Sequence, residues 1–328
     1  MRIVMMGTGR FAVPTLRKLA ESSHQLICLV TRPDVKGRGT PPPNPMRETA
    51  ESLGLPIIDP TSVNSPEAID SLRTMAADLF VVCDYGQILK SETLAITPLG
   101  GINLHGSLLP QYRGAAPIQR AMLAGETTSG VTVIHMTPRL DAGPILESLA
   151  VPIDPQENAE ELETRLAELG APLVLAAIDR LAAWDRQSQI GTTQDPQRAS
   201  KAPRLSKSEG LVDWRKSARE IAFQVRAFKP WPASYTYWHR DGQPPMRLIL
   251  DKVAAGANAS LPATTSAMPG EIVMVARDRV LIGTGDGLLE LVQVQPSGKR
   301  TMTIEEFLRG YPMVVGQQLG TEDKPTCG

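Results

Sequence analysis

The stretch from Arg2 to Val30, RIVMMGTGRFAVPTLRKLAESSHQLICLV, decides the fold class. It begins with an apolar run over residues 2–7, continues with apolar positions at helical spacing over 12–22 and ends with a second apolar run over 25–31. Continuous apolar runs are typical of strands that a parallel sheet buries on both faces, and parallel strands need a crossover helix between them. The stretch therefore predicts an α/β fold with a doubly wound, Rossmann-like, mostly parallel sheet.

The same alternation of strand and helix patterns continues as far as Trp184. Further strands are expected over residues 55–59, 77–85, 100–107 and, as a pair joined by a turn at Leu140–Gly143, within 128–153. Further helices are expected over residues 44–54, 66–76, 116–125 and 158–184. In a sheet of this class, ligands bind at the carboxyl ends of the strands, so that edge is where the functional residues should lie.

A second, smaller domain follows a change in composition. Residues 187–207 are polar and lack apolar periodicity, which predicts a linker between a first domain over 1–186 and a second over 208–316. The second domain begins with a helix pattern and a Pro-Trp-Pro turn, and its short alternating strands are typical of an OB-like β-barrel. Residues 317–328 are expected to form a frayed tail.

The composition excludes several classes of protein. The three cysteines form no CxxC motif and no cluster with histidine, so we expect no metal site and a reducing, cytoplasmic environment. No apolar run approaches the ~20 residues of a membrane span, and no signal peptide is visible at the N-terminus. We therefore expect a cytoplasmic protein that has no membrane partner.

Charge is distributed unevenly along the chain. Residues 198–252 carry twelve basic and five acidic side chains, a net charge of +7, whereas residues 1–197 carry 16 basic and 22 acidic ones, a net charge of −6. A basic segment of this size can bind a polyanion such as RNA, because each phosphate contact releases counterions. A merely solvated basic face explains the same pattern, and it is the more common case.

The first strand-to-helix turn, GTGRFA over residues 7–12, matches the relaxed dinucleotide-binding pattern GxGxxA. Thr31 and Arg32 stand at the end of the second strand, where an NAD site usually has an acidic residue, although Arg32 could accept a 2′-phosphate. A tight turn that needs the backbone freedom of glycine is therefore favoured over a nucleotide site.

Asn103, His105 and Asp141 are the candidate catalytic residues. Asn103 and His105 lie two apart on a strand and face the same side, and Asp141 follows a later strand of the sheet. An amide, an imidazole and a carboxylate suit direct acyl transfer to an amine, because they can stabilise the oxyanion and move protons. Ser107 lacks the GxSxG nucleophile motif. A polar cluster that only satisfies a strand end is the alternative.

Two long motifs around these residues resemble the folate-dependent formyltransferases, which transfer the formyl group of 10-formyltetrahydrofolate to an amine. They are NLHGSLLPQYRGAAPIQRAMLAGE over residues 103–126 and GVTVIHMTPRLDAGPIL over 130–146. The resemblance assigns the catalytic trio of the family to Asn103, His105 and Asp141. Motifs of the C-terminal half, such as RLSKSEGLVDW at 204–214, resemble the members that formylate initiator methionyl-tRNA.

The resemblance also implies which residues meet the two substrates. Residues expected to contact the formyl folate, the co-substrate, follow two neighbouring strands: Tyr85, Gln87, Ile88, Leu89, Ser107, Leu108, Leu109 and Pro110. Residues expected to contact the initiator methionyl-tRNA are basic: Lys36, Arg38, Lys201, Arg204 and Lys207. By the same similarity, the first domain would bind folate and catalyse the reaction, and the OB-like domain would position tRNA. The enzyme would work as a monomer.

The chain departs from the family pattern at three places. The first turn usually reads Gly-Thr-Pro-acid-Phe, but here Gly9 and Arg10 replace the proline and the acid. Pro41–Pro43 stand where the tRNA-binding loop usually continues with basic residues. Asp84 stands where a small apolar residue is common, beside the expected folate site. These departures bear on affinity and on discrimination between tRNAs more than on the type of reaction.

Three other functions remain as rivals at this point. The first is a relative with another acceptor, such as an amino-sugar nucleotide, glycinamide ribonucleotide or water, which would not need the basic second domain. The second is an NADP oxidoreductase built on GTGRFA. The third is an RNA-binding protein without catalytic activity.

Overall fold

The computed structural model describes residues 1–33, 44–256 and 267–323. Contacts within the chain divide it into two compact units. Unit 1 comprises Met1–Ile118, Thr127–Asp154 and Glu161–Arg204, and unit 2 comprises Gln119–Glu126, Pro155–Glu160 and Leu205–Gly328.

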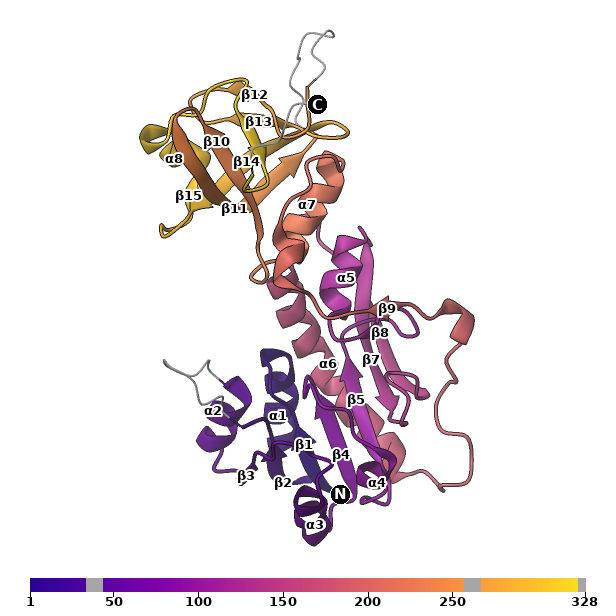
Figure 1. The fold of residues 1–328 in the computed structure, drawn as a ribbon. Helices are drawn as coiled ribbons and strands as arrows, with labels where there is room; N and C mark the ends of the chain where they lie inside the picture. The colour runs from indigo at the N-terminus through magenta and orange to yellow at the C-terminus, as the bar shows by residue number, and fades with distance from the viewer. Residues whose placement is uncertain (34–43, 257–266, 324–328) are drawn as a thin grey trace. The chain divides into compact units, whose positions relative to one another are not determined.

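Unit 1 is built on a seven-stranded sheet with the order β3-β2-β1-β4-β5-β7-β8 (Figure 1). The strands are β1 (Arg2–Met6), β2 (Gln25–Val30), β3 (Ile57–Ile58), β4 (Leu79–Cys83), β5 (Gly101–His105), β7 (Thr128–His135) and β8 (Ile145–Pro152). The pairs from β3 through β5 are parallel, whereas β7 runs antiparallel to both β5 and β8. The prediction of a doubly wound, mostly parallel sheet is therefore confirmed.

The helices of unit 1 connect these strands. They are η1 (Arg10–Ala12), α1 (Val13–Ala20), α2 (Pro45–Ser52), α3 (Pro66–Thr74), α4 (Ser91–Leu94), most of α6 (Ala159–Ala182) and η2 (Pro196–Arg198). Helix α3 begins where the sequence specifies a start, because the Ser65 side chain accepts a hydrogen bond from the Ala68 amide and Pro66 occupies the first turn. Helix α6 packs on β5 so closely that a Cβ atom at Gly170 would lie 2.7 Å from Leu104 Cδ2.

The topological switch point lies between β1 and β4. The chain goes from β1 to β2 on one side and later returns to β4 on the other. Backbone hydrogen bonds join the two strand ends, since the Thr8 amide donates to the Asp84 carbonyl at 3.1 Å. In open α/β sheets, the carboxyl ends of the strands at such a point form the usual ligand site.

The segment predicted as a linker makes extensive contacts within unit 1. The Thr192 and Ile145 backbones exchange two hydrogen bonds of 2.8 Å. Further along, β9 (Lys201–Ala202) pairs in parallel with β6 (Arg113–Gly114). Unit 1 consequently extends to Arg204, beyond the boundary expected at residue 186. These pairings are too short to leave a periodic pattern in the sequence.

Unit 2 contains an antiparallel, barrel-like sheet with the order β12-β13-β14-β11-β10-β16, and β15 pairs with β14. The strands are β10 (Ser234–Arg240), β11 (Gln243–Ala255), β12 (Ile272–Val275), β13 (Val280–Gly283), β14 (Leu288–Pro296), β15 (Met302–Thr303) and β16 (Gln318–Gly320). Its helices are α5 (Pro117–Leu123, mostly in this unit), η3 (Lys207–Gly210), α7 (Ala218–Ala227) and α8 (Ile304–Gly310). The OB-like fold expected for this region is confirmed.

Residues 318–320 correct the prediction of a frayed tail from residue 317. They form β16, which pairs with β10, and a bridge between Glu271 and Gln318 joins β16 to the start of β12. This bridge brings together the two edges of the sheet. The core beneath it includes Trp238 and Phe307, whose ring centroids lie 5.9 Å apart.

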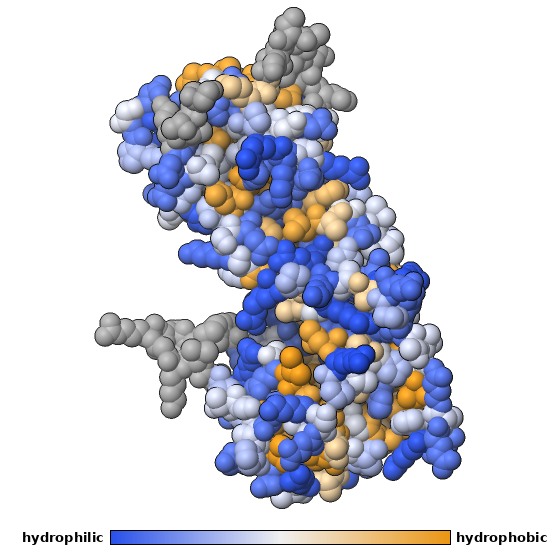
Figure 2. Space-filling model, turned by 45° about the vertical axis from the view of Figure 1, so that its right-hand side comes forward, coloured by the Kyte–Doolittle hydropathy of each residue, from blue (hydrophilic) through white to orange (hydrophobic). Residues whose placement is uncertain are grey.

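The surface is mostly hydrophilic on the face drawn in Figure 2, and hydrophobic residues form separate areas on it. The most exposed large hydrophobic side chains come from different parts of the chain: Ile88, Leu140, Trp231, Met268, Val314 and Val315. Among the described residues, no helix has the length and apolar character needed to span a membrane.

Candidate active site

Strand β5 carries two of the three candidate catalytic residues. It lies inside the sheet, paired in parallel with β4 and antiparallel with β7. Asn103 and His105 are two residues apart on it and therefore face the same side. The His105 side chain is 6% exposed, whereas Asn103 is half-buried and its amide has no hydrogen-bond partner among residues 1–33, 44–256 and 267–323.

The imidazole of His105 is fixed in orientation and in tautomer by a backbone carbonyl. His105 Nε2 lies 2.9 Å from the carbonyl oxygen of Tyr112, which can only accept a hydrogen bond. Nε2 therefore carries a proton and donates it to this carbonyl. In the neutral ring the remaining lone pair is on Nδ1, which is the nitrogen that can exchange a proton with a substrate.

Asp141 comes to the same place from the turn between β7 and β8. Its Oδ2 atom lies 3.8 Å from His105 Nδ1, too far for a direct hydrogen bond but close enough for strong attraction to a charged ring. The same oxygen accepts a hydrogen bond of 2.9 Å from the Gly114 amide. Asp141 itself has a positive φ of 48°, so the turn is held in a conformation that few side chains adopt.

Gln194 and Arg113 hold this turn, and neither was predicted from the sequence. Gln194 Nε2 donates to the carbonyl oxygens of Asp141 and Gly143 at 2.9 and 2.7 Å. Its own carbonyl oxygen accepts two hydrogen bonds from the guanidinium of Arg113. Arg113 is part of the motif quoted above, but Gln194 lies in the segment interpreted as a linker. Only the pairing of β6 with β9 and the bridge at Thr192 bring it to the turn.

Gln194→Ala is expected to lower kcat about tenfold and to lower the melting temperature. The substitution leaves two carbonyl oxygens and one guanidinium without their buried partner, which costs roughly 1–3 kcal/mol per group, and it frees the turn that positions Asp141. Steady-state kinetics and thermal denaturation measure both effects. Gln197→Ala, in the exposed helix η2, is the matched control. Unchanged kcat in a destabilised Gln194→Ala protein would show that Gln194 supports the fold and not the site.

The predicted folate residues after β4 differ in their environment. Tyr85 and Leu89 are buried, and the hydroxyl of Tyr85 has no hydrogen-bond partner among the residues that the structure describes. Burial raises the pKa of Tyr85 to about 12, so it remains a neutral hydrogen-bond donor. Gln87 accepts a hydrogen bond from the Val63 amide, and Ile88 is 61% exposed. The segment thus offers an apolar side chain and backbone groups beside β4.

The predicted folate residues after β5 form a loop that is held against β7. Thr132 Oγ1 donates to the Ser107 carbonyl at 2.7 Å and accepts from the Leu109 amide at 3.1 Å. The hydroxyl of Ser107 donates to the Gln111 carbonyl at 2.7 Å, which fits a structural role and not a nucleophile. Leu109 is buried, whereas Leu108 and Pro110 are half-buried.

The residues predicted to contact tRNA are not all described. Lys36 and Arg38 lie outside the described residues, as do Pro41–Pro43. Lys201 and Arg204 are exposed in unit 1, and Lys207 is exposed in unit 2.

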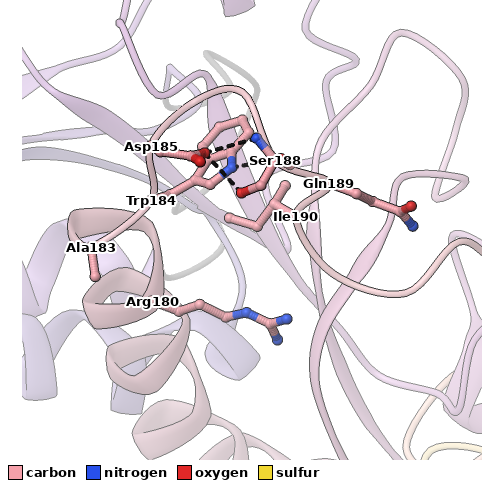
Figure 3. A pocket seen from close by; sticks show the side chains of 7 residues that line it. All are labelled: Arg180, Ala183, Trp184, Asp185, Ser188, Gln189 and Ile190. Carbon is pink, nitrogen blue, oxygen red and sulfur yellow. Dashed lines mark hydrogen bonds between the residues drawn. The ribbon is translucent and has the colours of Figure 1, made fainter.

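Two other features were candidates for a functional site, a metal-binding cluster and the pocket in Figure 3. Within the described part of the chain, no group of three or more His, Cys, Asp or Glu side chains could hold a metal ion. The pocket at the end of α6 encloses about 260 Å³ and is lined by Arg180, Ala183, Trp184, Asp185, Ser188, Gln189 and Ile190 (Figure 3). Its Asp185 carboxylate accepts three hydrogen bonds from Gln187 and Ser188, which lower its pKa and close the loop. None of the predicted site residues lines it.

Family models match both halves of the chain. A model described as "Formyl transferase" matches residues 1–178, and one described as "Formyl transferase, C-terminal domain" matches residues 204–312. The methionyl-tRNA formyltransferase of Rhodopirellula baltica is 46% identical over 97% of this chain and 96% of its own length. The methionyl-tRNA formyltransferase of Geobacter sulfurreducens is 40% identical over 98% of this chain and 97% of its own.

Solved structures share the fold at lower identity. The sugar 3N-formyltransferase WlaRD, crystallised with dTDP and 5-N-formyl-THF, has a TM-score of 0.62 and 18% identity, covering 92% of this chain and 99% of its own. HypX from Aquifex aeolicus in complex with tetrahydrofolic acid has a TM-score of 0.59 and 16% identity, covering 97% of this chain and 50% of its own.

Proposed function

The chain belongs to the methionyl-tRNA formyltransferase family, and we propose that Asn103, His105 and Asp141 are the residues with which it transfers the formyl group. The reaction moves this group from 10-formyltetrahydrofolate to the free amino group of methionyl-tRNA. The observation that carries the assignment is the arrangement around His105, with Nε2 held by the Tyr112 carbonyl and Nδ1 beside the Asp141 carboxylate.

This arrangement gives His105 a defined task. A second proton on Nδ1 makes the ring an imidazolium, and the Asp141 carboxylate 3.8 Å away stabilises that charge. The protonated Nδ1 can donate a hydrogen bond to the oxyanion that develops when the amine attacks the formyl carbon, and then its proton to the folate nitrogen as the bond from that nitrogen to the formyl carbon breaks. The neutral ring can then take up the proton that the attacking amine loses. Asp141 keeps its own position because the Gly114 amide donates to it. Acid catalysis of this kind contributes typically 10²–10⁴-fold.

Asn103 supplies a second donor on the same face of β5. Its half-buried amide has no partner in the described residues, so the NH₂ group is available to the formyl oxygen. A donor that is positioned before the reaction stabilises the oxyanion without reorganisation, and removing one typically costs about 10²–10³-fold in kcat. The acceptor brings its own nucleophile, because an α-amino group has a pKa of about 7.7–8.0 and is partly neutral at cellular pH.

Two segments that flank the trio support a proposal for where the folate co-substrate binds. Tyr85 offers an unpartnered buried hydroxyl, and the loop from Ser107 to Pro110 is rigidly held at the carboxyl end of β5. We infer that these segments, together with Gln87–Leu89, bind the folate and present its formyl group to Asn103 and His105.

We infer that the basic stretch over residues 198–252 binds tRNA. In support, four of its five acidic side chains already pair with or cap neighbouring groups. Asp213 pairs with Arg215, Asp251 with Lys229, and Glu220 caps α7. Glu209 pairs with Arg120 and also caps η3. These four carboxylates are engaged with neighbouring groups. Lys201, Arg204 and Lys207 are exposed and are the proposed phosphate contacts.

Binding of methionyl-tRNA is expected to weaken steeply as salt is added. Each phosphate contact releases counterions, so log K should fall linearly with log [salt]. Lys207→Ala should reduce the slope by about 0.9, the contribution of one contact. Fluorescence titrations at several salt concentrations measure the slope, with Lys18→Ala, exposed on α1, as the control. A slope near zero would contradict the proposal that the basic stretch binds RNA.

The function is tested by transfer of labelled formyl from 10-formyltetrahydrofolate. Methionyl-tRNA is compared with uncharged initiator tRNA and with glycinamide ribonucleotide as parallel acceptors. Label on methionyl-tRNA alone is the expected result. Label on another acceptor, or release of free formate only, would overturn the assignment of the acceptor. Cytoplasmic location and the monomeric state stay predictions.

A further inference from the structure

Two charged side chains lie over glycine backbones at the switch point between β1 and β4. The carboxylate of Asp84 contacts Gly9, and the guanidinium of Arg32 contacts Gly86 and donates to its carbonyl oxygen. Asp84 and Gly86 follow β4, Gly9 follows β1, and Arg32 follows β2. The carboxyl ends of three neighbouring strands thus contribute to one polar site, which the reaction described above does not use.

Position 9 needs a glycine because the Asp84 carboxylate occupies the place of a side chain, not because the backbone conformation demands one. Its φ of −86° is open to any residue, but a Cβ atom there would lie 1.6 Å from Asp84 Oδ2 and 2.7 Å from Asp84 Cγ. No other residue is among the three nearest atoms to that Cβ. The two departures from the family pattern, at positions 9 and 84, are therefore one structural feature: the missing side chain makes room for the carboxylate.

Asp84 follows the strand that neighbours the catalytic strand β5, and its carboxylate lies by Gly9 at the carboxyl edge of the sheet. The parallel pairing of β4 with β5 ends at Cys83 and Leu104, so the next residues, Asp84 and His105, stand at the same level on neighbouring strands. Adjacent strands are about 4.8 Å apart. Beyond Asp84 the chain turns toward residues 61–64, because Gln87 accepts from the Val63 amide and the Ile88 carbonyl accepts from Asn64. The Asp84 carboxylate, which lies over Gly9, faces the Thr8–Gly9 turn.

The Asp84 side chain is accessible to a ligand, and its ionisation lowers the stability of the fold. Its side chain is exposed, and it accepts no hydrogen bond from the residues that the structure describes. The surrounding protein nevertheless removes enough water to raise the pKa of Asp84 to about 6, against the attraction of Arg32. A pKa raised above the unfolded value means that ionisation of Asp84 destabilises the fold as pH rises through about 6. A group that costs stability at the carboxyl edge of the sheet is typical of a functional site.

We propose that Asp84, given room by Gly9, accepts a hydrogen bond from the α-amino group of the aminoacyl-tRNA acceptor and so directs its lone pair to the formyl carbon. The inference rests on the proposed function of the neighbouring trio. An amine offers N–H donors, and an ionised carboxylate that lacks a partner accepts them strongly. The carboxylate supplements the trio, which holds the formyl group, by orienting the other reactant.

The first test compares wild type with Asp84→Asn in formyl transfer between pH 5 and pH 9. Above about pH 6 the ionised carboxylate orients the amine, so the wild type should exceed the variant in kcat/KM for methionyl-tRNA by about tenfold at pH 8. The ratio should approach one at pH 5, where Asp84 is protonated. Imidazoles and α-amino groups ordinarily titrate in this range, but His105 and the acceptor are the same in both proteins, so the ratio of wild type to variant reports on Asp84. Arg10 and Arg32 stay charged, and burial raises the pKa of Cys83 and of Tyr85.

A double-mutant cycle tests the coupling of the two positions. Gly9→Ala alone should lower kcat/KM for methionyl-tRNA about as much as Asp84→Ala, because the new Cβ displaces the carboxylate. In the Asp84→Ala protein the same Gly9→Ala change should have no further effect. The KM for the folate should stay within twofold in all variants. Asp70→Asn, an exposed carboxylate paired with Arg73 on α3, is the control.

Inhibition by tRNA analogues identifies the group that Asp84 contacts. Initiator tRNA acylated with the des-amino analogue of methionine, which has no donor at the α-carbon, and uncharged tRNA serve as competitors of methionyl-tRNA. Asp84→Asn should weaken binding of methionyl-tRNA and leave both competitors unchanged. Equal weakening of all three would place the contact on the terminal nucleotide and overturn the proposal, as would a wild-type pH profile in Asp84→Asn. Absence of transfer by the wild type would instead overturn the proposed function itself.

Discussion

Replacing His105 with alanine is expected to lower kcat by about 10³-fold, which makes it one of the two largest effects expected for a single substitution. The variant loses the donor for the oxyanion and the acid for the leaving nitrogen together. The KM for methionyl-tRNA should change little, because the proposed tRNA contacts at Lys201, Arg204 and Lys207 lie elsewhere in the sequence. Single-turnover formyl transfer with saturating substrates measures the chemical step directly.

The control for this experiment is His24→Gln. His24 lies near the N-terminus of the chain and contacts Asp179 on α6, and it has no proposed role in the reaction. It should retain wild-type activity. Substantial turnover in His105→Ala would remove the imidazole from the mechanism and leave the Tyr112 hydrogen bond as a purely structural contact.

Asp141→Asn is expected to lower kcat by about 10²-fold with little change in melting temperature. The amide oxygen of asparagine can still accept the hydrogen bond from Gly114, so the turn should keep its shape. The negative charge beside His105 Nδ1 is lost, and with it the stabilisation of the imidazolium. The rate of formyl transfer and thermal denaturation separate the two effects.

Asp141→Ala is the matched comparison, because it removes both the charge and the acceptor for Gly114. It should be as slow as Asp141→Asn and also less stable. If Asp141→Asn were fully active and only Asp141→Ala were impaired, the role of Asp141 would be to hold Gly114, and the electrostatic part of the mechanism would be wrong.

The sheet of unit 1 could be predicted because each central strand carries its own signal. The run in β4 is apolar throughout and the run in β1 is apolar after Arg2, and four residues of β1 and all five of β4 are buried. Such runs occur where both faces of a strand are covered, so pattern and environment agree. The barrel of unit 2 could be predicted for a related reason, since burial alternates along β10 and β14 as it does in strands with one face in the core.

Other elements depend on partners distant in the sequence and left no local pattern. Strands β6 and β9 have two residues each, and they form only because Arg113 and Lys201 pair across a long stretch of chain. Strand β16 pairs with β10 only when the barrel closes. Three residues cannot show a period, so this segment was wrongly predicted as part of the tail.

The reactive groups of the candidate site could be predicted from the sequence, but the residues that hold them in place could not. Alternation along β5 places Asn103 and His105 on one face, and the turn after β7 brings Asp141 to His105. Gln194 has no such signal, because glutamine in a polar segment is common. The contact between Gly9 and Asp84 also escaped prediction, since each was noticed as a separate departure from the family pattern.

The central claim is that His105 and Asp141 act as one unit in the chemical step, with Asn103 as a separate donor. Rapid-quench transfer of labelled formyl to methionyl-tRNA, in a single turnover with both substrates bound, tests this most directly. Asn103→Ala, His105→Ala and Asp141→Asn should each slow the step by about 10²–10³-fold. The double variant of His105 and Asp141 should be no slower than His105→Ala, because residues that act together are not additive. Independent, multiplying effects of His105 and Asp141, or an unchanged rate in any of the single variants, would contradict the account.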